Sequence, residues 1–367
     1  MTPEDLRADV PVLSDVAYMN TGASGPSPRR VVTAATDFQE RMEFQAPAAG
    51  DVYPTAWDAL DAARERVAAF VGADEHEIAL TSSTVDGIAT VASAVDWQPG
   101  DVVVHTDLEH PSGRLPWERL ADLYDIEVRV LETEAGRLDR DDLKAAVDDA
   151  RLLCLSSLSW NYGTQLPVAD VVDVAHDAGA QVLVDAVQSP GQVPVDVDSW
   201  GADFVAAAGH KWLLGVWGSG FLYVDDEALE TLTPQRVGYR SVEAPKEPGY
   251  ALHPGARRFE IGTTSIAPYV ALGEAMDVVD AVGLDTIQSR VERLTDRLKE
   301  GLGERLLSPR SYESGLVTFA ADDPEATVQH LREAGIVVRD LPAPEAVRAS
   351  IHVFNTAADV DRLLDAL

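Results

Sequence analysis

Between residues 55 and 225, short apolar runs rich in β-branched residues alternate with segments of helical periodicity, such as 116–124, 139–149 and 168–178. This alternation is typical of parallel strands joined by crossover helices. Only a glycine-rich segment separates the last two runs, which favours an antiparallel return there. The pattern predicts an α/β fold with a mostly parallel seven-stranded sheet flanked by helices, its strands at 78–80, 102–104, 128–131, 152–155, 181–184, 204–207 and 220–224.

The pattern changes after about residue 225. Periodicity fades into a stretch rich in Pro and Gly up to Gly262, which we interpret as an active-site loop and a domain crossing. A long helical region, 267–302, is interrupted near Gly283, and a strand-helix-strand pattern follows. We therefore expect a smaller α+β domain, and we place the divisions at an N-terminal segment that packs with it (1–17), a large α/β domain (18–255) and the small domain itself (256–367).

Charge and composition narrow the possible partners and locations. The chain has 62 acidic and 29 basic residues and a formal net charge of −33, so it repels nucleic acid and anionic membranes and stays hydrated at high ionic strength. No apolar run reaches about 18 residues, and the N-terminus is acidic, unlike a secretory signal. The single cysteine, Cys154, and the absence of HExxH or paired CxxC spacing exclude an internal disulfide and disfavour a metal site. We expect a cytoplasmic, salt-adapted protein with neither nucleic-acid nor membrane partners.

Lysine is scarce in this chain, with only four residues. Lys144, Lys246 and Lys299 lie in charged helices or a Pro-flanked loop, which predicts solvated side chains. Lys211 instead follows the strand at 204–207 and precedes the apolar residues 212–214. Partial desolvation there would lower the pKa of its amine and make the amine available to a carbonyl group, although a surface lysine fits the same pattern.

Two other polar segments also follow strands of the predicted sheet. Asp185 directly follows the strand at 181–184, so it could keep a pyridinium nitrogen protonated at the ligand-binding edge, or it could cap a turn. The segment 81–87, rich in hydroxyl groups, opens a helix whose free N–H groups favour an anion such as phosphate. Its hydroxyls also suit ordinary N-caps. The three features together favour a shared site.

Taken in order, the motifs of the chain resemble those of the class V aminotransferase family. This is a branch of the fold-type I enzymes that depend on pyridoxal 5'-phosphate (PLP), and it includes cysteine desulfurases and isopenicillin N epimerase-like proteins. The similarity covers nearly the whole length. It implies the fold of PLP-dependent transferases of type I, PLP as cofactor, and a homodimer, and it rests on the segments 18–22, 109–112, 159–163, 185–188, 209–211, 258–263, 348–351 and 354–356.

The resemblance also implies residue roles. Three residues would be catalytic: Lys211 would hold PLP as a Schiff base and shuttle a proton, Asp185 would pair with the pyridinium nitrogen, and His110 would stack on the ring. Arg348, helped by Asn20, would bind the substrate carboxylate. The remaining cofactor contacts would come from Gln188 and Asn161 near the phenolic oxygen, from Ser83, Thr84, Val85 and His210 at the phosphate, and from Thr263 at the phosphate of the neighbouring subunit.

Two departures from the family pattern shape the expected reaction. Ala208 replaces a serine that usually contacts the phosphate, so one cofactor hydrogen bond is expected to be missing. Cysteine desulfurases carry a nucleophilic cysteine on a loop that corresponds to 338–345, and here that interval has none. Cys154 cannot replace it, because it lies in a strand predicted to be buried. These observations disfavour a cysteine desulfurase, and the segment 211–224 looks more like the aminotransferase and epimerase-like members.

We therefore expect an aminotransferase that acts on a small amino acid. An epimerase and a β-eliminating lyase that works without a catalytic cysteine are alternatives of the same family. A PLP-binding sensor that has lost catalysis is a third, of a different class. The complete set of Lys211, Asp185, His110 and Arg348 argues against the sensor, because a protein that only binds PLP has no need to orient a substrate.

Overall fold

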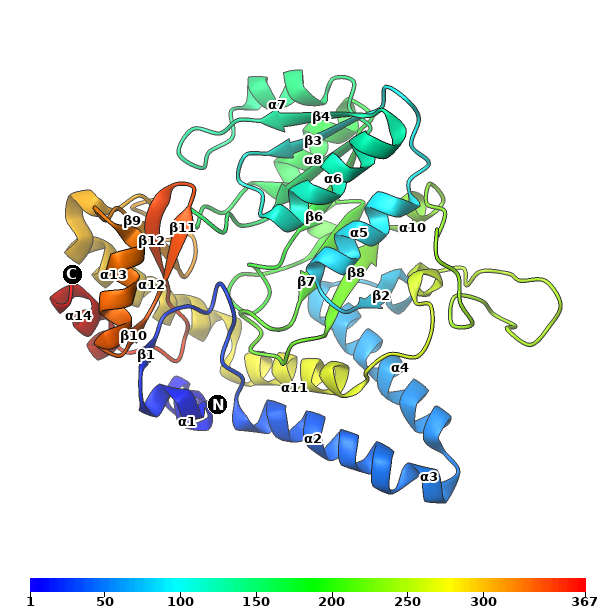
Figure 1. The fold of residues 1–367 in the computed structure, drawn as a ribbon, viewed down its shortest axis with the longest axis horizontal. Coiled ribbons are helices and arrows are strands. Elements are labelled where there is room, and N and C mark those ends of the chain that lie inside the picture. The colour runs from blue at the N-terminus through cyan, green and yellow to red at the C-terminus, as the bar shows by residue number, and fades with distance from the viewer.

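The computed structural model describes all 367 residues, and its centre is a seven-stranded sheet (Figure 1). The strand order is β2-β8-β7-β6-β5-β3-β4. Every neighbouring pair is parallel except those of β8, which runs antiparallel to both β7 and β2. The predicted sheet and its antiparallel return are confirmed, with strands β2 (Ile78–Thr81), β3 (Val102–Thr106), β4 (Glu127–Leu131), β5 (Leu152–Ser156), β6 (Gln181–Asp185), β7 (Phe204–Ala208) and β8 (Gly220–Val224).

Helices cover both faces of this sheet, which explains why its central strands are mostly apolar and almost fully buried. On β5, Leu153 and Leu155 face one hydrophobic cluster, whereas Leu152 and Cys154 face another. The first cluster includes side chains of α4 (Val52–Val71), α7 (Arg140–Val147), α8 (Val168–Asp177) and α11 (Ala267–Val282). The second includes side chains of α5 (Thr84–Ala94) and α6 (Pro111–Tyr124). Helix α6 begins five residues before its predicted start because His110 caps it and Pro111 occupies its first turn.

A second, antiparallel sheet follows in the last part of the chain, in the order β11-β12-β9. Its strands are β9 (Leu316–Phe319), β11 (Arg339–Pro342) and β12 (Glu345–Ser350). The residues Ala343 and Pro344 connect β11 directly to β12, so the interval 338–345 is mainly a tight hairpin rather than a long loop. The helices of this part are α12 (Leu284–Leu302), α13 (Pro324–Glu333) and α14 (Ala357–Asp365).

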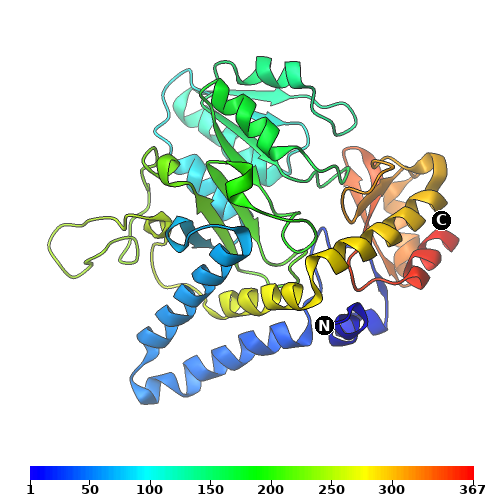
Figure 2. The ribbon, with the colours of Figure 1, turned by 180° about the vertical axis from the view of Figure 1, so that it is seen from behind.

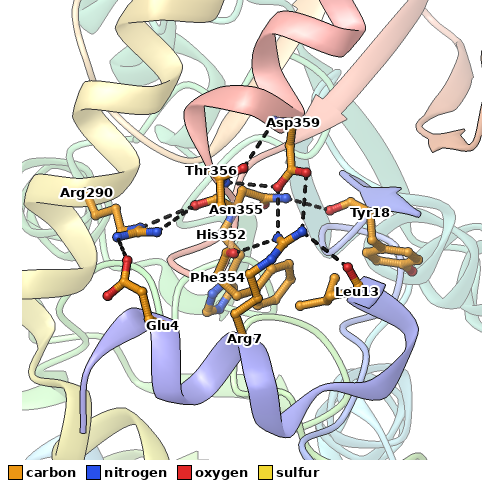
Figure 3. Close-up of polar contacts among 10 residues, drawn as sticks. All are labelled: Glu4, Arg7, Leu13, Tyr18, Arg290, His352, Phe354, Asn355, Thr356 and Asp359. Atoms are coloured by element: carbon orange, nitrogen blue, oxygen red, sulfur yellow. Dashed lines mark hydrogen bonds and ion pairs between the residues drawn. The ribbon is translucent and has the colours of Figure 1, made fainter. Parts of the chain in front are cut away.

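The start of the chain is tied to this second sheet. Strand β1 (Ala17–Tyr18) pairs in parallel with β10 (Ile336–Val337). Arg7, on α1 (Pro3–Asp9), donates to the carboxylate of Asp359 at 2.9 Å (Figure 3). Arg290 donates to the carboxylate of Glu4 at 2.7 Å and to the carbonyl oxygen of Asn355 at 3.1 Å. These contacts hold the segment that follows β12 against the N-terminal helix.

The helices α2 (Arg29–Phe44) and α3 (Ala46–Ala49) join the layer that α4 and α11 form on the large sheet. The helices α2, α3 and α4 form a long bent arm, and α11 packs against both α2 and α4. Figure 2 shows α11 and α12 in succession, separated at Gly283, where φ is +85°. The short helices α9 (Val197–Trp200) and α10 (Asp226–Leu229) flank β7 and β8, and the chain between α10 and α11 projects outward as a loop. No helix is long and apolar enough to cross a membrane.

One lysine prediction is wrong. Lys144 and Lys246 are exposed as expected, but Lys299 is only 6% exposed. It lies on the face of α12 that carries the buried residues Leu298 and Leu302. Its apolar stem packs there while the ammonium donates to the carbonyl oxygen of Ser311 at 2.7 Å. Burial lowers the pKa of this amine.

Candidate active site

Most of the predicted site residues meet in one cavity of about 200 Å³ at the carboxyl ends of β5, β6 and β7. The N-termini of α5 and α6 and the β11–β12 hairpin complete its walls. This is the sheet edge at which open α/β folds bind ligands. The predicted residues that line the cavity are Ser83, Thr84, Val85, His110, Asp185, Gln188, His210, Lys211 and Arg348.

Lys211 lies on a turn that follows β7. The amide of Leu214 donates to the carbonyl oxygen of Lys211 at 3.0 Å, and Gly215 donates to Gly209 at 2.8 Å, so the turn is closed by its own backbone. Burial lowers the pKa of the Lys211 amine to about 8, an effect that the carboxylate of Asp185 partly offsets. At neutral pH a larger share of this amine is therefore neutral and nucleophilic than in an exposed lysine.

Asp185 is the last residue of β6 and is 3% exposed. Its side chain accepts one hydrogen bond from the protein, from the amide of Val187 at 3.0 Å. Burial raises the pKa of this carboxyl group, and Lys211 opposes that effect. A buried carboxylate with spare acceptor capacity is suited to a cationic N–H group such as a pyridinium.

His110 is the N-cap residue of α6. Its Nδ1 accepts the backbone N–H of Ser112 at 3.2 Å and lies 2.8 Å from the hydroxyl of the same residue. Burial lowers the pKa of the imidazole to about 4, with a further contribution from Lys211, so the ring is neutral. Since Nδ1 is an acceptor, the ring proton resides on Nε2. The indole of Trp160 meets this ring edge-on, with centroids 5.3 Å apart.

The segment 83–85 forms the start of α5, as predicted. Ser83 is the N-cap residue and accepts from the amide of Asp86 at 3.2 Å. The hydroxyl of Thr84 is buried and has no partner. Helix α5 lies very close to the sheet at Gly220, where an added Cβ would be 3.1 Å from the carbonyl carbon of Ser83. A helix N-terminus with an unpartnered hydroxyl fits a phosphate group, so we call the segment 83–85 the phosphate cradle. Lys211, Asp185 and this cradle together fit PLP.

Arg348, on β12, is 1% exposed and makes a single hydrogen bond, from Nη1 to the carbonyl oxygen of Trp160 at 2.7 Å. Its Nε and Nη2 atoms are buried without partners. The other two buried arginines, Arg64 and Arg240, both pair with Glu260. Burial lowers the pKa of Arg348 to about 9. The free donors of this guanidinium match the two oxygens of a carboxylate.

Three predicted residues lie outside the cavity lining. Asn161 donates to the carbonyl oxygen of Ala343 at 3.2 Å and so supports the hairpin. Thr263 is exposed and lies 2.6 Å from the hydroxyl of Tyr239. Asn20 forms a parallel bridge with Ser350, near Arg348. Their predicted roles in binding cofactor or substrate stay predictions.

Gln188 lines the cavity, but its side chain is already engaged. Its Oε1 accepts from the indole of Trp212 at 2.7 Å, and its Nε2 donates to the carbonyl oxygen of Gly22 at 3.0 Å. The indole of Trp212 in turn stacks on His352, at 5.7 Å between centroids. Gln188 therefore braces the turn that carries Lys211, and only one of its amide hydrogens is free for the cofactor.

Sequence reasoning assigned no role to three residues that shape the site. Arg339 and Trp160 line the cavity beside Arg348. Glu109 is buried and accepts from the hydroxyls of Thr106 and Ser156, both at 2.7 Å. Burial raises the pKa of Glu109 to about 7. The strand pattern could have located Glu109 and Trp160 after β3 and β5, but Arg339 reaches the cavity only through the hairpin register.

Gly25 packs closely against the turn at 209–215, which carries Lys211 and is called the lysine turn below. An added Cβ there would lie 2.1 Å from the carbonyl oxygen of Lys211. We expect Gly25→Ala to lower the free energy of unfolding by about 2 kcal/mol, a typical overpacking cost, and to displace Lys211. Denaturant unfolding and cofactor absorbance measure the two effects. The matched control is Gly273→Ala in α11, where nothing lies within 4 Å, and it should be neutral or stabilising by up to ~1 kcal/mol. Equal stability of both variants would contradict the prediction.

The fold and this cavity define a PLP-dependent enzyme of fold type I, and comparisons with known proteins agree. The family model for class V aminotransferases matches residues 17–363. The chain belongs to the class V aminotransferase family.

The similar proteins are named for C–S chemistry. A probable cysteine desulfurase of Methanothermobacter thermautotrophicus is 35% identical over 100% of this chain and 98% of its own length. A cysteine desulfurase structure from Thermococcus onnurineus has a TM-score of 0.92 at 30% identity and covers 100% of this chain and 97% of its own. The cystine C–S lyase C-DES, solved with its product cysteine persulfide, has a TM-score of 0.90 at 28% identity, with 97% and 98% covered. A C-DES mutant, with a TM-score of 0.92 at 28% identity and 98% of each chain covered, carries glycine covalently linked to PLP. PLP is the cofactor of this chain.

These findings correct the expected function. The prediction of an aminotransferase is wrong, as is the alternative of a lyase that works without a catalytic cysteine, because the relatives and structural neighbours are cysteine desulfurases and a C–S lyase. The residues that hold PLP are shared by the whole family, so they did not discriminate between reactions. The absence of cysteine from 338–345 therefore did not exclude a similarity to cysteine desulfurases. Cys154 is, as expected, fully buried in β5.

Proposed function

We propose that this chain is a PLP-dependent C–S lyase of the cysteine desulfurase type, which breaks the Cβ–S bond of cysteine or of a cysteine derivative. The observation that carries this proposal is the buried guanidinium of Arg348, which has two unpartnered donors in the same cavity as Lys211 and Asp185. Such a group is suited to the α-carboxylate of an amino acid, next to a lysine and an aspartate suited to PLP. The names of the relatives supply the sulfur chemistry.

The cofactor would be held by groups from three elements. The backbone N–H groups of Ser83, Thr84 and Val85 and the neighbouring His210 would bind its phosphate, and Asp185 would accept a hydrogen bond from its ring nitrogen. Lys211 would form the covalent link. Bound PLP supplies an electron sink that weakens the bonds to the substrate Cα.

Two residues of the chain would move protons. The Nζ of Lys211, whose pKa is lowered to about 8, would accept the proton of Cα. The neutral imidazole of His110 carries its proton on Nε2, which would donate to the sulfur as the C–S bond breaks. Ser112 would hold this tautomer through its contacts with Nδ1.

We also propose a homodimer and a salt-adapted cytoplasmic setting. Thr263 is exposed and lies outside this chain's own cavity, which supports a role at the phosphate of a second subunit. The net charge of −33 supports function at high ionic strength. The division into 1–17, 18–255 and 256–367 remains part of this proposal.

The function is tested by incubating the PLP-loaded protein in high salt with cysteine or with cystine. The cysteine assay contains a thiol reductant, and the cystine assay contains none. We expect the release of sulfide or persulfide. The cofactor absorbance should change and the amino acid should be consumed at the same time. Alanine, which lacks the Cβ–S bond, serves as the matched control and should release no sulfur. Accumulation of the pyridoxamine form without sulfur release would overturn the proposal.

A further inference from the structure

Trp212 follows Lys211 directly in the lysine turn, and its side chain is fully buried. Two glycines leave space for this residue. An added Cβ at Gly191 would collide with the carbonyl group of Trp212, and one at Gly315 would lie 2.8 Å from its ring. Because the chain packs closely on both its backbone and its ring, the indole has little freedom to move.

The segment that follows β12 holds Trp212 from another side. His352 lies in this segment and stacks both on the indole, at 5.7 Å between ring centroids, and on Phe354, at 4.8 Å (Figure 3). Its Nε2 donates to the carbonyl oxygen of Trp212 at 2.9 Å, and its Nδ1 accepts from the amide of Val353 at 2.8 Å. Burial lowers the pKa of this imidazole to about 4, so the ring is neutral and keeps its proton on Nε2. The position of Trp212 is thus set by groups that do not belong to the cavity.

The indole N–H of Trp212 determines how the amide of Gln188 is oriented. The Oε1 atom of Gln188 accepts this N–H at 2.7 Å, and its Nε2 donates to the carbonyl oxygen of Gly22 at 3.0 Å. Exchanging the oxygen and nitrogen of the amide would place two donors face to face at Trp212 and two acceptors face to face at Gly22. Gln188 lines the cavity, and the second hydrogen of its Nε2 has no protein partner.

This contact distinguishes Trp212 from the other six tryptophans. Two others have a hydrogen-bonded indole. Trp97 donates to the backbone carbonyl oxygen of Ala92 at 2.7 Å, and Trp217 donates to the hydroxyl of Ser24 at 3.1 Å. Only Trp212 bonds to a side chain that lines the cavity.

We propose that Trp212 is a positioning residue for the cofactor, because it holds the Gln188 amide so that an N–H group, and not the amide oxygen, is offered to bound PLP. This inference rests on PLP as the cofactor and not on the proposed C–S lyase reaction. A hydrogen bond to the charged form of a group favours that form. An N–H group near the phenolic oxygen of PLP, where Gln188 is expected to bind, therefore favours the deprotonated form of lysine-bound PLP, in which this oxygen carries more negative charge.

A pH titration of the visible absorbance of the PLP-loaded protein, without substrate, provides the first test. Trp212→Phe keeps an aromatic ring and removes the N–H. We expect the pKa of lysine-bound PLP to rise by at least about half a unit, the effect of one hydrogen bond. The matched control is Trp97→Phe, which removes a buried indole and its hydrogen bond away from the cavity and should leave this pKa unchanged. Equal shifts in the two variants, or no shift in Trp212→Phe, would overturn the proposal.

A second variant separates the hydrogen bond from the packing of the ring. Trp212→benzothienylalanine replaces the N–H with sulfur and keeps the shape of the indole. It should remain folded even where Trp212→Phe does not, and we expect the same rise in the pKa of lysine-bound PLP. An unchanged pKa in this variant would contradict the proposal, because packing and not the N–H would then account for any effect of Trp212→Phe.

A double-mutant cycle tests whether Trp212 acts through Gln188. Gln188→Met should by itself raise the pKa of lysine-bound PLP, and Trp212→Phe should add no further shift in that background. Additive shifts would show that the two residues act independently and would rule out the positioning role. All variants retain the other titratable side chains that line the cavity, namely His110, Asp185, His210, Lys211, Arg339 and Arg348. Since no substrate is present, a protein that shows the expected shifts but cleaves no C–S bond would overturn the proposed function and retain this inference.

Discussion

Lys211→Ala is expected to abolish both the visible absorbance band of lysine-bound PLP and all measurable C–S cleavage, a loss of at least about 1,000-fold in kcat. No other lysine can replace it. Lys144 and Lys246 are exposed, and the ammonium of Lys299 is bound to the carbonyl oxygen of Ser311 at 2.7 Å. Absorbance spectra of the purified protein and single-turnover assays measure the two losses.

The variant should remain folded, because the lysine turn is closed by backbone hydrogen bonds, including that of Leu214 to the carbonyl oxygen of residue 211 at 3.0 Å. The matched control is Lys246→Ala, which removes an exposed lysine from a loop and should keep the band and the activity. A Lys211→Ala protein that kept the absorbance band would disprove the assignment of this lysine. Circular dichroism separates loss of the cofactor from loss of the fold.

Arg348→Gln is expected to lower kcat/KM by about 100-fold while leaving the cofactor band in place. The guanidinium is 1% exposed, and its Nε and Nη2 have no protein partner, so its burial is not compensated within the chain. Removing one member of a buried charge pair typically weakens a complex by about 2–5 kcal/mol. Here Arg348 is the member removed, and the substrate carboxylate is the member left without a partner. The loss should appear mainly in KM, since the residue is suited to binding rather than to proton transfer.

The same substitution should not destabilise the protein. A buried charge without an opposite charge is unfavourable to folding, so we expect the free energy of unfolding to stay unchanged or to rise by ~1 kcal/mol. The contrasting control is Arg64→Gln, because Arg64 is equally buried but bonds to Glu260 at 2.7 Å, and its loss should destabilise the fold. Urea unfolding compares the two. A clear loss of stability in Arg348→Gln would indicate a structural role instead.

Local patterns were sufficient for the large sheet and the main chemistry. Runs of three to five mostly apolar residues predicted all seven strands, because most strands of this sheet are covered on both faces by helices and so have no polar face. Asp185 and Lys211 were recognised because parallel strands bring their carboxyl ends to a common edge. The cradle at 83–85 followed from hydroxyls at a helix start.

The sequence motifs did not predict the reaction correctly, because they identify the residues that bind PLP and not those that select the reaction. PLP weakens the same bonds in every member of the family, and the protein selects the outcome through the groups around the substrate. The prediction used only the absence of a cysteine from the interval 338–345. Its structure is a hairpin that brings Arg339 beside Arg348, a feature that depends on register and not on any single residue type.

The pattern of hydrophobic and polar positions by itself determined the sheet, the order of its strands along the chain, and the segments that carry Lys211, Asp185 and the phosphate cradle, because these depend on local periodicity and on where strands end. Only the tertiary structure decided which charges lack partners. Lys299 proved to be buried, and Arg339 and Arg348 proved to be adjacent and unpaired, since burial and pairing depend on residues brought together by the fold from distant parts of the chain.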